Sequence, residues 1–235
     1  MIPPPPARYA DARVSYQEGV FDETTLAATP LAQFERWYAD AVNGGLAEPN
    51  AMVLATVDAA GAPSSRTVLL KQADARGFVF YTNHASRKAT ELAAHGHAAL
   101  TFPWYPMQRQ VCVRGTVERV GVEESAAYFA TRPWGSRIGA WASRQSAVVA
   151  DRAELEARYA ELARRWPDHA RPDDVPLPVH WGGYVVRPVE VEFWAGRPSR
   201  LHDRLVFVPV ATGSDVVGPV ALDDAGGWRV LRRQP

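Results

Sequence analysis

The stretch SSRTVLLKQADARGFVFYTNHASRK, residues 64–88, combines two short apolar strands with the first turn of a helix that begins at Ser86. Hydroxyl and cationic side chains lie along these three elements: Arg66, Lys71, Tyr81, Thr82, Arg87 and Lys88. Of the 26 lysine and arginine residues in the chain, only Lys71 and Lys88 are lysine. Arginine forks, lysine charges and the free N–H groups of a helix start are suited to binding phosphate. The stretch therefore predicts a phosphate site. The alternative is a set of solvated cations at strand edges and a helix start.

Alternation of apolar and polar residues predicts short strands on both sides of this stretch, at residues 51–57, 66–71, 77–82, 98–104, 109–119, 183–186, 189–194, 204–210 and 228–231. The half-buried pattern is clearest at 189–194, where Glu190 and Glu192 alternate with valine and phenylalanine. Because the first five strands are mostly joined tightly and have one helix among them, they favour an antiparallel barrel over βαβ units. The predicted fold class is therefore mainly β (α+β), with helices on the flanks.

Helical spacing of apolar residues predicts helices at residues 30–46, 86–94, 122–131, 136–141 and 151–166. Ser86 and Ser136 are the predicted caps of the second and fourth of these helices. Residues 1–28 are predicted to be a flexible N-terminal segment, because residues 3–6 are prolines and no clear period follows them. Since no linker separates the blocks of strands, residues 29–235 are predicted to form a single domain.

The composition is that of an ordinary globular chain of 235 residues, of which 47% are hydrophobic and 22% are charged. Its formal net charge is zero, which argues against nucleic acid or an anionic membrane as a partner. The single cysteine, Cys112, excludes an internal disulfide and fits a reducing compartment. With no apolar signal region and no run of about 20 apolar residues, the chain is predicted to be cytoplasmic. His95 and His97 lack companion ligands, so no metal is expected.

A second group of polar side chains follows at the end of the predicted helix 122–131. Tyr128 and Arg132 are four residues apart and share a helix face, and Ser136 lies just beyond, where the next helix is predicted to begin. A phenol, a guanidinium and a helix start form a second candidate phosphate site. The alternative is that Tyr128 packs in the core and that Arg132 is solvated.

The sequence RLHDR, residues 200–204, alternates basic side chains with others. In an extended segment Arg200, His202 and Arg204 would point the same way. Such crowding is unfavourable unless an anionic or electron-rich group faces it. The alternative is a solvated strand entry. No GxGxxG, GxxxxGK[ST] or GxSxG motif is present, which argues against dinucleotide-binding, P-loop and hydrolase functions.

Taken together, these motifs resemble the pyridoxamine 5′-phosphate oxidase family, over nearly everything from about Arg13 onward. The matching pieces, in family order, are PNAMVLATVD, SSRTVLLK, FVFYTN, SRKA, RQV, ESAAYFATRP, SRIGAWASRQS, WGGY, EFWAGR and RLHDR. The resemblance implies a Greek-key-like, FMN-binding split β-barrel that works as a homodimer with FMN at the subunit interface.

The resemblance also implies the residues of the site. It places FMN against Arg66, Thr67, Val68, Leu69, Leu70, Lys71, Tyr81, Thr82, Arg87, Lys88, Gln110, Gln145, Ser146, Trp194 and Arg204, some of them from the partner subunit. It places the substrate against Arg13, Tyr16, Lys71, Tyr128, Arg132, Ser136, Arg200, Leu201 and His202. Of these, Arg200 and His202 would be the catalytic residues at the pyridine ring.

The implied reaction oxidises phosphorylated B6 vitamers with O2. Pyridoxamine 5′-phosphate or pyridoxine 5′-phosphate would give pyridoxal 5′-phosphate and hydrogen peroxide. Two other functions stay open: a related FMN oxidase acting on another ring, as in phenazine biosynthesis, and a non-catalytic carrier of FMN or pyridoxal phosphate. The chain departs from the family pattern at Cys112 and near the C-terminus, where Arg233 replaces a leucine.

Overall fold

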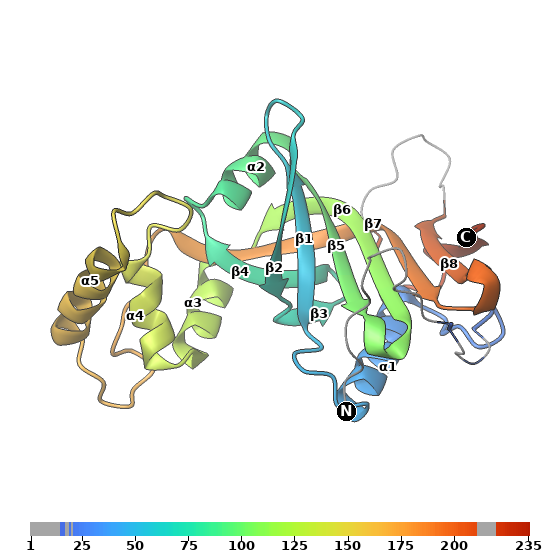
Figure 1. The fold of residues 1–235 in the computed structure, drawn as a ribbon, viewed down its shortest axis with the longest axis horizontal. Helices are drawn as coiled ribbons and strands as arrows, with labels where there is room; N and C mark the ends of the chain where they lie inside the picture. The colour runs from blue at the N-terminus through green and yellow to red at the C-terminus, as the bar shows by residue number, and fades with distance from the viewer. Residues whose placement is uncertain (1–14, 17–18, 20, 211–219) are drawn as a thin grey trace, which may run out of the picture.

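The computed structural model describes residues 15–16, 19, 21–210 and 220–235. Within these ranges the chain forms one curled antiparallel sheet of nine strands with helices around it (Figure 1). The order in the sheet is β2-β1-β5-β6-β7-β4-β3, with β8 paired to β7 and β9 to β8. The strands are β1 (Ala51–Val57), β2 (Pro63–Leu69), β3 (Gln72–Asp74), β4 (Gly77–Asn83), β5 (His97–Trp104), β6 (Arg109–Arg119), β7 (Trp181–Ala195), β8 (Asp203–Pro209) and β9 (Trp228–Arg232). The predicted antiparallel, mainly β fold is confirmed.

The predicted hairpin of the first two strands is present, with Leu54 of β1 opposite Arg66 of β2. The strand β2 ends at Leu69, so Lys71 lies outside the strand that was predicted to contain it. The backbone N–H of Lys71 instead donates to the carbonyl of Val79, 2.8 Å away, at the start of the short pairing between β3 and β4. Lys71 is thereby held beside β4.

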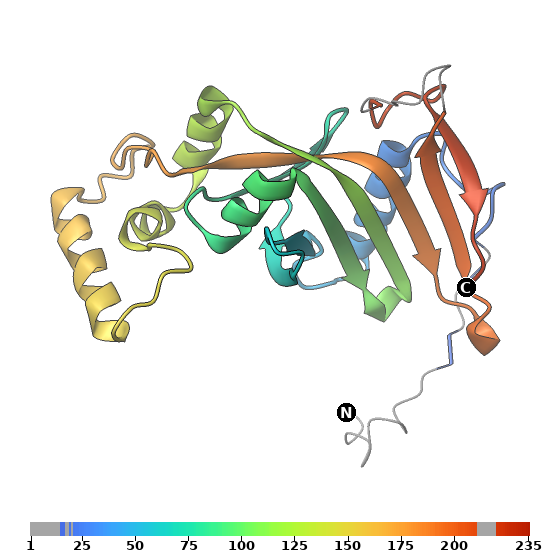
Figure 2. The same ribbon diagram turned by 90° about the horizontal axis from the view of Figure 1, so that it is seen from above.

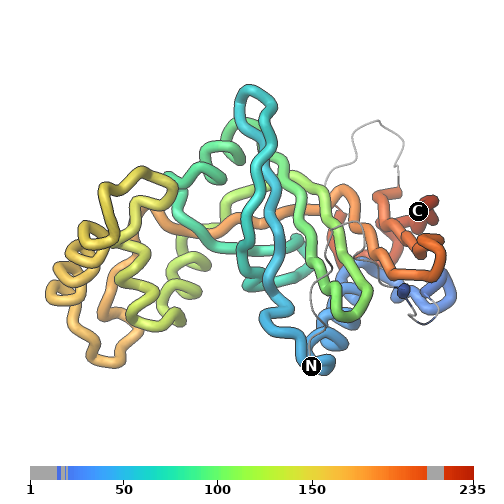
Figure 3. The backbone as a smooth tube through the Cα atoms, viewed as in Figure 1, coloured from blue at the N-terminus to red at the C-terminus, as the bar shows by residue number. Residues whose placement is uncertain are grey.

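The strand β7 is the longest and runs from the helical end of the molecule to the end that holds β8 (Figures 2 and 3). The sequence predicts two strands here, 183–186 and 189–194. The structure has one strand, and its pairing with β6 shifts register between Arg114 and Gly115, where Val189 of β7 is left without a partner in β6. Gly115 lies opposite Pro188, so the missing N–H of the proline falls at an irregularity of the ladder.

Five helices and two 3-10 turns complete the described part of the chain: α1 (Pro30–Asn43), α2 (Arg87–His95), η2 (Tyr105–Met107), α3 (Val122–Thr131), α4 (Trp134–Ala142), α5 (Arg152–Arg165) and η3 (Pro198–Arg200). Ser86 is the N-cap residue of α2, but its side chain makes no capping hydrogen bond. The prediction that Ser136 caps a helix is wrong, because α4 begins two residues earlier with Pro133 at its N-cap. Ser136 lies in the first turn instead.

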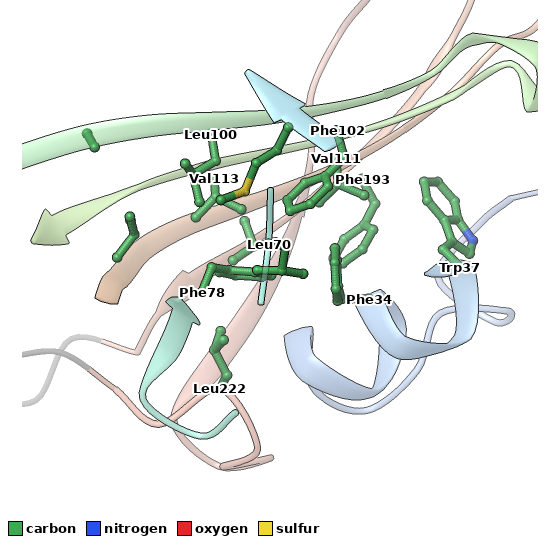
Figure 4. Close-up of a cluster of buried hydrophobic side chains, with 14 of the residues drawn as sticks. Phe34, Trp37, Leu70, Phe78, Leu100, Phe102, Val111, Val113, Phe193 and Leu222 are labelled. Carbon is green, nitrogen blue, oxygen red and sulfur yellow. The ribbon is translucent and has the colours of Figure 1, made fainter. Parts of the chain in front are cut away.

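The main core packs α1 against the curled sheet (Figure 4). The ring of Phe34 lies 4.9 Å from that of Phe78 and 4.9 Å from that of Phe102, measured between centroids. Phe21, inside the segment predicted to be flexible, is buried against Trp37 at 4.8 Å. A smaller cluster under α3, α4 and α5 contains Phe129, Ile138, Val175 and Trp181. In the described part of the chain, no helix has both the length and the apolar character that a bilayer crossing requires.

The close approach at Gly115 gives a test of the sheet register. In Gly115→Ala the new Cβ would lie 2.2 Å from the carbonyl oxygen of Arg187 and 3.0 Å from Cα of Pro188. Because these are backbone atoms, we expect a loss of about 1–3 kcal/mol in the free energy of unfolding. Urea unfolding at one fixed protein concentration measures it.

Gly139→Ala in α4 is the control for this substitution. Apart from its chain neighbours and the backbone of its own helix, no atom of the described residues lies within 4 Å of its added Cβ. Because alanine also favours the helix, the midpoint should stay or rise. A Gly115→Ala midpoint equal to that of the unaltered chain would contradict the close approach.

Candidate functional site

A cavity of about 900 Å³ lies between the sheet and the helical end of the molecule. It is lined by β2, the end of β4, α2, the ends of α3 and α4, and the start of β7. The structure therefore brings both predicted phosphate-binding groups, except for Arg87, to one cavity. Its lining residues are Arg66, Thr67, Val68, Leu69, Lys71, Tyr81, Thr82, Asn83, Lys88, Tyr128, Thr131, Arg132, Pro133, Ser136, Gly139, Ala140, Ser143, Gln145 and Trp181.

Lys88 is the most deeply buried cation of this cavity, with 7% of the residue exposed. Its Nζ lies 3.1 Å from Oε1 of Gln145 and 3.3 Å from Oγ1 of Thr82, and 3.4 Å from Oγ of Ser86. Among the described residues no carboxylate lies within salt-bridge distance of it. Burial, followed by repulsion from Arg66, lowers the pKa of Lys88. The ammonium is thus held by neutral oxygens and has no counter-ion.

Two arginines of the same stretch converge on Glu91, which is buried in α2. Its Oε1 accepts from Nε of Arg87 at 2.7 Å, and its Oε2 accepts from Nη2 of Arg66 at 3.1 Å and from Oγ of Ser64 at 2.7 Å. Thr56 also donates to Oε2. Burial would raise the pKa of Glu91, but these four hydrogen bonds lower it to about 2. Glu91 is not among the predicted site residues, although its position four residues after Arg87 on one helix is a signal for such a pair.

Three stacked aromatic rings form one wall of the cavity. The ring centroid of Tyr81 lies 4.1 Å from that of Tyr128 and 5.3 Å from that of Trp181, with interplanar angles of 20° and 8°. Burial, and secondarily Glu124, raises the pKa of Tyr81 to about 12, so its phenol stays protonated at neutral pH. The stack joins the two predicted phosphate-binding groups, because Tyr81 belongs to one and Tyr128 to the other.

Arg132 lies over the ring of Trp181, with its guanidinium carbon 4.8 Å from the centroid. Its Nη1 is buried and has no hydrogen-bond partner. Burial lowers the pKa of Arg132, and no carboxylate contributes to the shift. The alternative of a solvated Arg132 is therefore wrong. An indole face holds the charge without neutralising it, and Arg132 lines the cavity with that charge uncompensated by any carboxylate of the described residues.

The other predicted cofactor residues lie at the opposite end of β7. Trp194 of β7 pairs with Gln110 of β6 and with Arg204 of β8. Nε and Nη2 of Arg204 donate to Glu192 at 2.9 and 2.8 Å. The rings of His202 and Trp194 lie 4.6 Å apart. None of these residues lines the 900 Å³ cavity. Within one chain the predicted site residues therefore lie in two separate groups.

Contrary to the sequence prediction, Arg200, His202 and Arg204 do not share one face of an extended segment. The extended conformation begins only at Asp203, because residues 198–200 form a 3-10 turn and Arg200 has a φ of 63°. Arg200 and Leu201 are exposed. Tyr16 lies against this group, with its ring 5.6 Å from that of His202, whereas Arg13 is outside the described residues.

Burial and a hydrogen bond define the state of His202. Its Nδ1 accepts from the backbone N–H of Arg197 at 3.0 Å. Burial, followed by the charge of Arg200, lowers the pKa of His202. A neutral imidazole that accepts at Nδ1 carries its proton on Nε2, so this nitrogen can donate to a ligand.

Arg233 belongs to a charge network beside Arg204. Its Nη2 pairs with Glu190 at 2.7 Å and its Nη1 with Glu192 at 3.4 Å, and Arg114 pairs with Glu190 at 2.7 Å. Burial would raise the pKa of Glu190, but Arg233 and Arg114 lower it to about 2. The departure from the family pattern at this position is thus accommodated by two carboxylates.

The remaining predicted residues lie near the cavity or in the core. Arg87 and Ser146 line a neighbouring cavity of about 610 Å³, and the backbone N–H of Arg87 donates to Oγ of Ser146 at 3.1 Å. Leu70 is buried in the main core and does not line the cavity. Burial raises the pKa of the Cys112 thiol. Within the described ranges no group of three potential metal ligands occurs.

Comparison with solved structures supports the fold. PhzG from Burkholderia lata, in complex with tetrahydrophenazine-1-carboxylic acid, superimposes with a TM-score of 0.80 at 29% identity, covering 94% of this chain and all of that one. A pyridoxamine 5′-phosphate oxidase-related, FMN-binding protein from Nostoc punctiforme has a TM-score of 0.63 at 16% identity, covering 86% and 97%. The predicted split-barrel fold is confirmed by these likenesses.

Residues 38–165 match the family described as pyridoxamine 5′-phosphate oxidase, and residues 181–235 match the pyridoxine 5′-phosphate oxidase C-terminal dimerisation region. The pyridoxine/pyridoxamine 5′-phosphate oxidase of Kineococcus radiotolerans is 58% identical over 226 residues, which cover 96% of this chain and 98% of the relative. The protein of the same name from Streptomyces avermitilis is 51% identical over 230 residues, 96% of each chain. Because both segments match and the relatives align along nearly the whole length, the chain belongs to the pyridoxamine 5′-phosphate oxidase family.

Proposed function

We propose that this protein is an FMN-dependent oxidase that converts pyridoxamine 5′-phosphate and pyridoxine 5′-phosphate to pyridoxal 5′-phosphate, with O2 as the electron acceptor and H2O2 as the second product. The observation that carries the proposal is one cavity with two sets of cations, each centred on a residue, Lys88 or Arg132, that pairs with no carboxylate of the described chain. Two phosphorylated ligands, a cofactor and a substrate, match two such sets. The names of the relatives support an oxidase of B6 phosphates.

The residues at the first set fit FMN. Lys88 has only hydroxyl and amide oxygens around its Nζ, which leaves its charge for an anion. The neighbouring cations Arg66 and Arg87 would hold the phosphate, and Thr82 with Gln145 would contact the rest of the cofactor. FMN, when bound, would supply the chemistry by accepting a hydride from the 4′ carbon of the substrate and passing the electrons to O2.

The residues at the second set fit the phosphate of the substrate. Arg132 lines the cavity and pairs with no carboxylate of the described residues, and Tyr128 and Ser136 line the same cavity. Lys71, which is exposed at the edge of the cavity, would add a second cation. Holding the phosphate here would fix the distance between the pyridine ring and the cations around Lys88. Binding a remote group in this way orients the reacting carbon.

A homodimer would bring the second group of predicted residues to this cavity. The 15 residues of β7 extend roughly 50 Å at about 3.3 Å per residue, so Trp181 at one end and Trp194 at the other cannot reach one ligand within a chain. The dimerisation region matched at residues 181–235 contains Trp194, His202 and Arg204. A second copy of this group would then cover the cavity of the first chain.

In such a dimer His202 and Arg200 would act on the pyridine ring of the substrate. The Nε2–H of His202 would donate to a ring substituent, because its Nδ1 already accepts from Arg197. Arg200 is exposed and would place its charge where electron density changes on the ring. These two residues would orient the 4′ carbon and exclude water from it.

Flavin binding and turnover by the purified full-length chain test the proposal. We expect a yellow protein that contains one FMN per chain, consumes O2 with pyridoxine 5′-phosphate or pyridoxamine 5′-phosphate, and forms pyridoxal 5′-phosphate. A chain that binds FMN without turnover would be a carrier. Turnover of a phenazine precursor with none of either B6 phosphate would make it a flavin oxidase of another ring. Either result would overturn the proposal.

The variant Arg132→Ala should raise KM for pyridoxine 5′-phosphate by roughly ten- to a hundredfold, the effect expected from losing a charge-assisted hydrogen bond. FMN content should not change. Arg165→Ala is the matched control, because Arg165 also lies over an indole, that of Trp166 at 4.9 Å, but lines no part of the cavity. Loss of FMN with an unchanged KM in Arg132→Ala would show that the two phosphate sites are assigned in the wrong order.

The variant Lys88→Met should weaken FMN binding and yet stabilise the FMN-free protein. A buried ammonium without a counter-ion is unfavourable, so replacing it with an apolar side chain should raise the free energy of unfolding by about 0.5–2 kcal/mol. Thermal unfolding of the FMN-free proteins measures the gain. Lys71→Met, at the exposed lysine, should change this stability little. A less stable Lys88→Met protein would mean that Lys88 contributes to folding and is not held there for a ligand.

A further inference from the structure

Glu91 connects three elements behind the cavity. It lies in α2, with 3% of its side chain exposed, and contacts Thr56 of β1 and Ser64 and Arg66 of β2, as well as Arg87 in its own helix. Its low pKa means that the carboxylate is charged at every pH at which the protein would work. A permanent negative charge therefore lies directly behind the cations that were predicted to bind phosphate.

Each oxygen of the Glu91 carboxylate accepts a hydrogen bond from a different arginine. Oε1 accepts from Nε of Arg87, the side-chain nitrogen nearest the backbone, so Glu91 occupies neither Nη group of that guanidinium. The side chain of Arg87 makes no other hydrogen bond or ion pair with the described residues, and 62% of it is exposed. Oε2 accepts from Nη2 of Arg66, whose Nη1 is held by Thr56 and by the carbonyl of Leu54 at 3.4 Å. The carboxylate thus anchors Nε of Arg87, and it holds the guanidinium of Arg66 together with Thr56, Ser64 and the carbonyl of Leu54. It leaves Nη1 and Nη2 of Arg87 for a ligand.

The charge of the group also matches a phosphate monoester. Arg66, Arg87 and Lys88 are three cations, and among the described residues Glu91 is the one carboxylate that pairs with any of them. Their net charge of +2 equals the magnitude of the charge of a phosphate dianion. Without Glu91 the three cations would have no anion among them, and the two guanidinium groups would have no common anchor.

We propose that Glu91 is a positioning residue for the phosphate of the flavin cofactor, acting through Arg66 and Arg87 and not by touching the ligand. The inference rests on the proposed function, because it takes FMN as the phosphorylated ligand at this end of the cavity. The competing account is that Glu91 only ties α2 to β1 and β2. These two roles differ in one respect: a positioning residue affects a flavin with a phosphate and leaves a flavin without one unaffected.

Binding of FMN and of riboflavin to the FMN-free, full-length chain separates the two accounts. Glu91→Gln keeps the shape of the side chain but removes its charge. It also replaces one acceptor oxygen with an NH2 group, which is a donor and would face the donor groups around it. We expect the Kd for FMN to rise about ten- to thirtyfold, since two charge-assisted contacts lose their anchor. The Kd for riboflavin should change by less than about twofold. Quenching of flavin fluorescence on binding measures both.

Glu156→Gln is the matched control for this substitution. Glu156 also pairs with an arginine four residues before it, Arg152 at 2.6 Å, but it is exposed on α5 and lines no cavity. Both flavins should bind this variant as they bind the unaltered chain. Glu91→Asp is a second variant in case the amide prevents folding. Its shorter side chain keeps the charge but cannot hold both arginines, so it should weaken FMN binding by a smaller factor and leave riboflavin binding unchanged.

Equal loss of FMN and riboflavin binding in Glu91→Gln would show that the residue only supports the fold. Unchanged or tighter FMN binding would show that Glu91 neutralises the arginines without orienting them. Wild-type FMN affinity in Glu91→Asp would contradict the two-arginine anchor. Each of these results overturns the inference while leaving the proposed function intact, whereas an unaltered chain that binds neither flavin overturns both.

Discussion

The pairing of β7 with its neighbours is the constraint on which the rest of the molecule depends. Its first residues pair with β4, which sets Trp181 beside Tyr81, and its last residues pair with β6 and β8, which sets Trp194 between Gln110 and Arg204. Since side chains alternate between the two faces of a strand, the register of β7 with its neighbours fixes which side chains belong to the group at each end of the strand. One continuous strand therefore carries parts of two groups, and the distance between these groups is what makes a second copy of the chain necessary to our proposal.

At the cavity, the balance of charge is as informative as its shape. The chain buries Lys88 among neutral oxygens and lays Arg132 on an indole, and it uses a carboxylate, Glu91, only where two arginines need a common anchor. Buried charges without partners are unfavourable for folding. Their presence together at one cavity is most simply explained by anionic ligands that compensate them.

Much of the fold could be predicted from the sequence, because strands and helices leave a local period. The alternation at 189–194 and the helical spacing of Leu31, Phe34 and Trp37 in α1 correspond to observed elements. Continuity of β7 through Pro188 could not be predicted, because it depends on pairing with β6, which is far away in sequence and meets β7 with a register shift at this point. Half of the candidate site followed from local motifs. Glu91 was missed because an i, i+4 pair is common on helix surfaces and only burial distinguishes this one. The separation of Arg204 from Lys88 depends on topology, which single motifs do not encode.

The buried, unpaired ammonium of Lys88 has a consequence for the life of the protein in the cell. A chain that has just been made, before it meets an anionic cofactor, carries that uncompensated charge and has a larger unfolded fraction than the loaded form. A ligand that binds only the native state reduces this fraction in proportion to its concentration relative to Kd. Proteases remove unfolded chains continuously, so a difference of one or two kcal/mol alters abundance several-fold. The amount of this protein would then follow the supply of its cofactor, without any change in the expression of its gene.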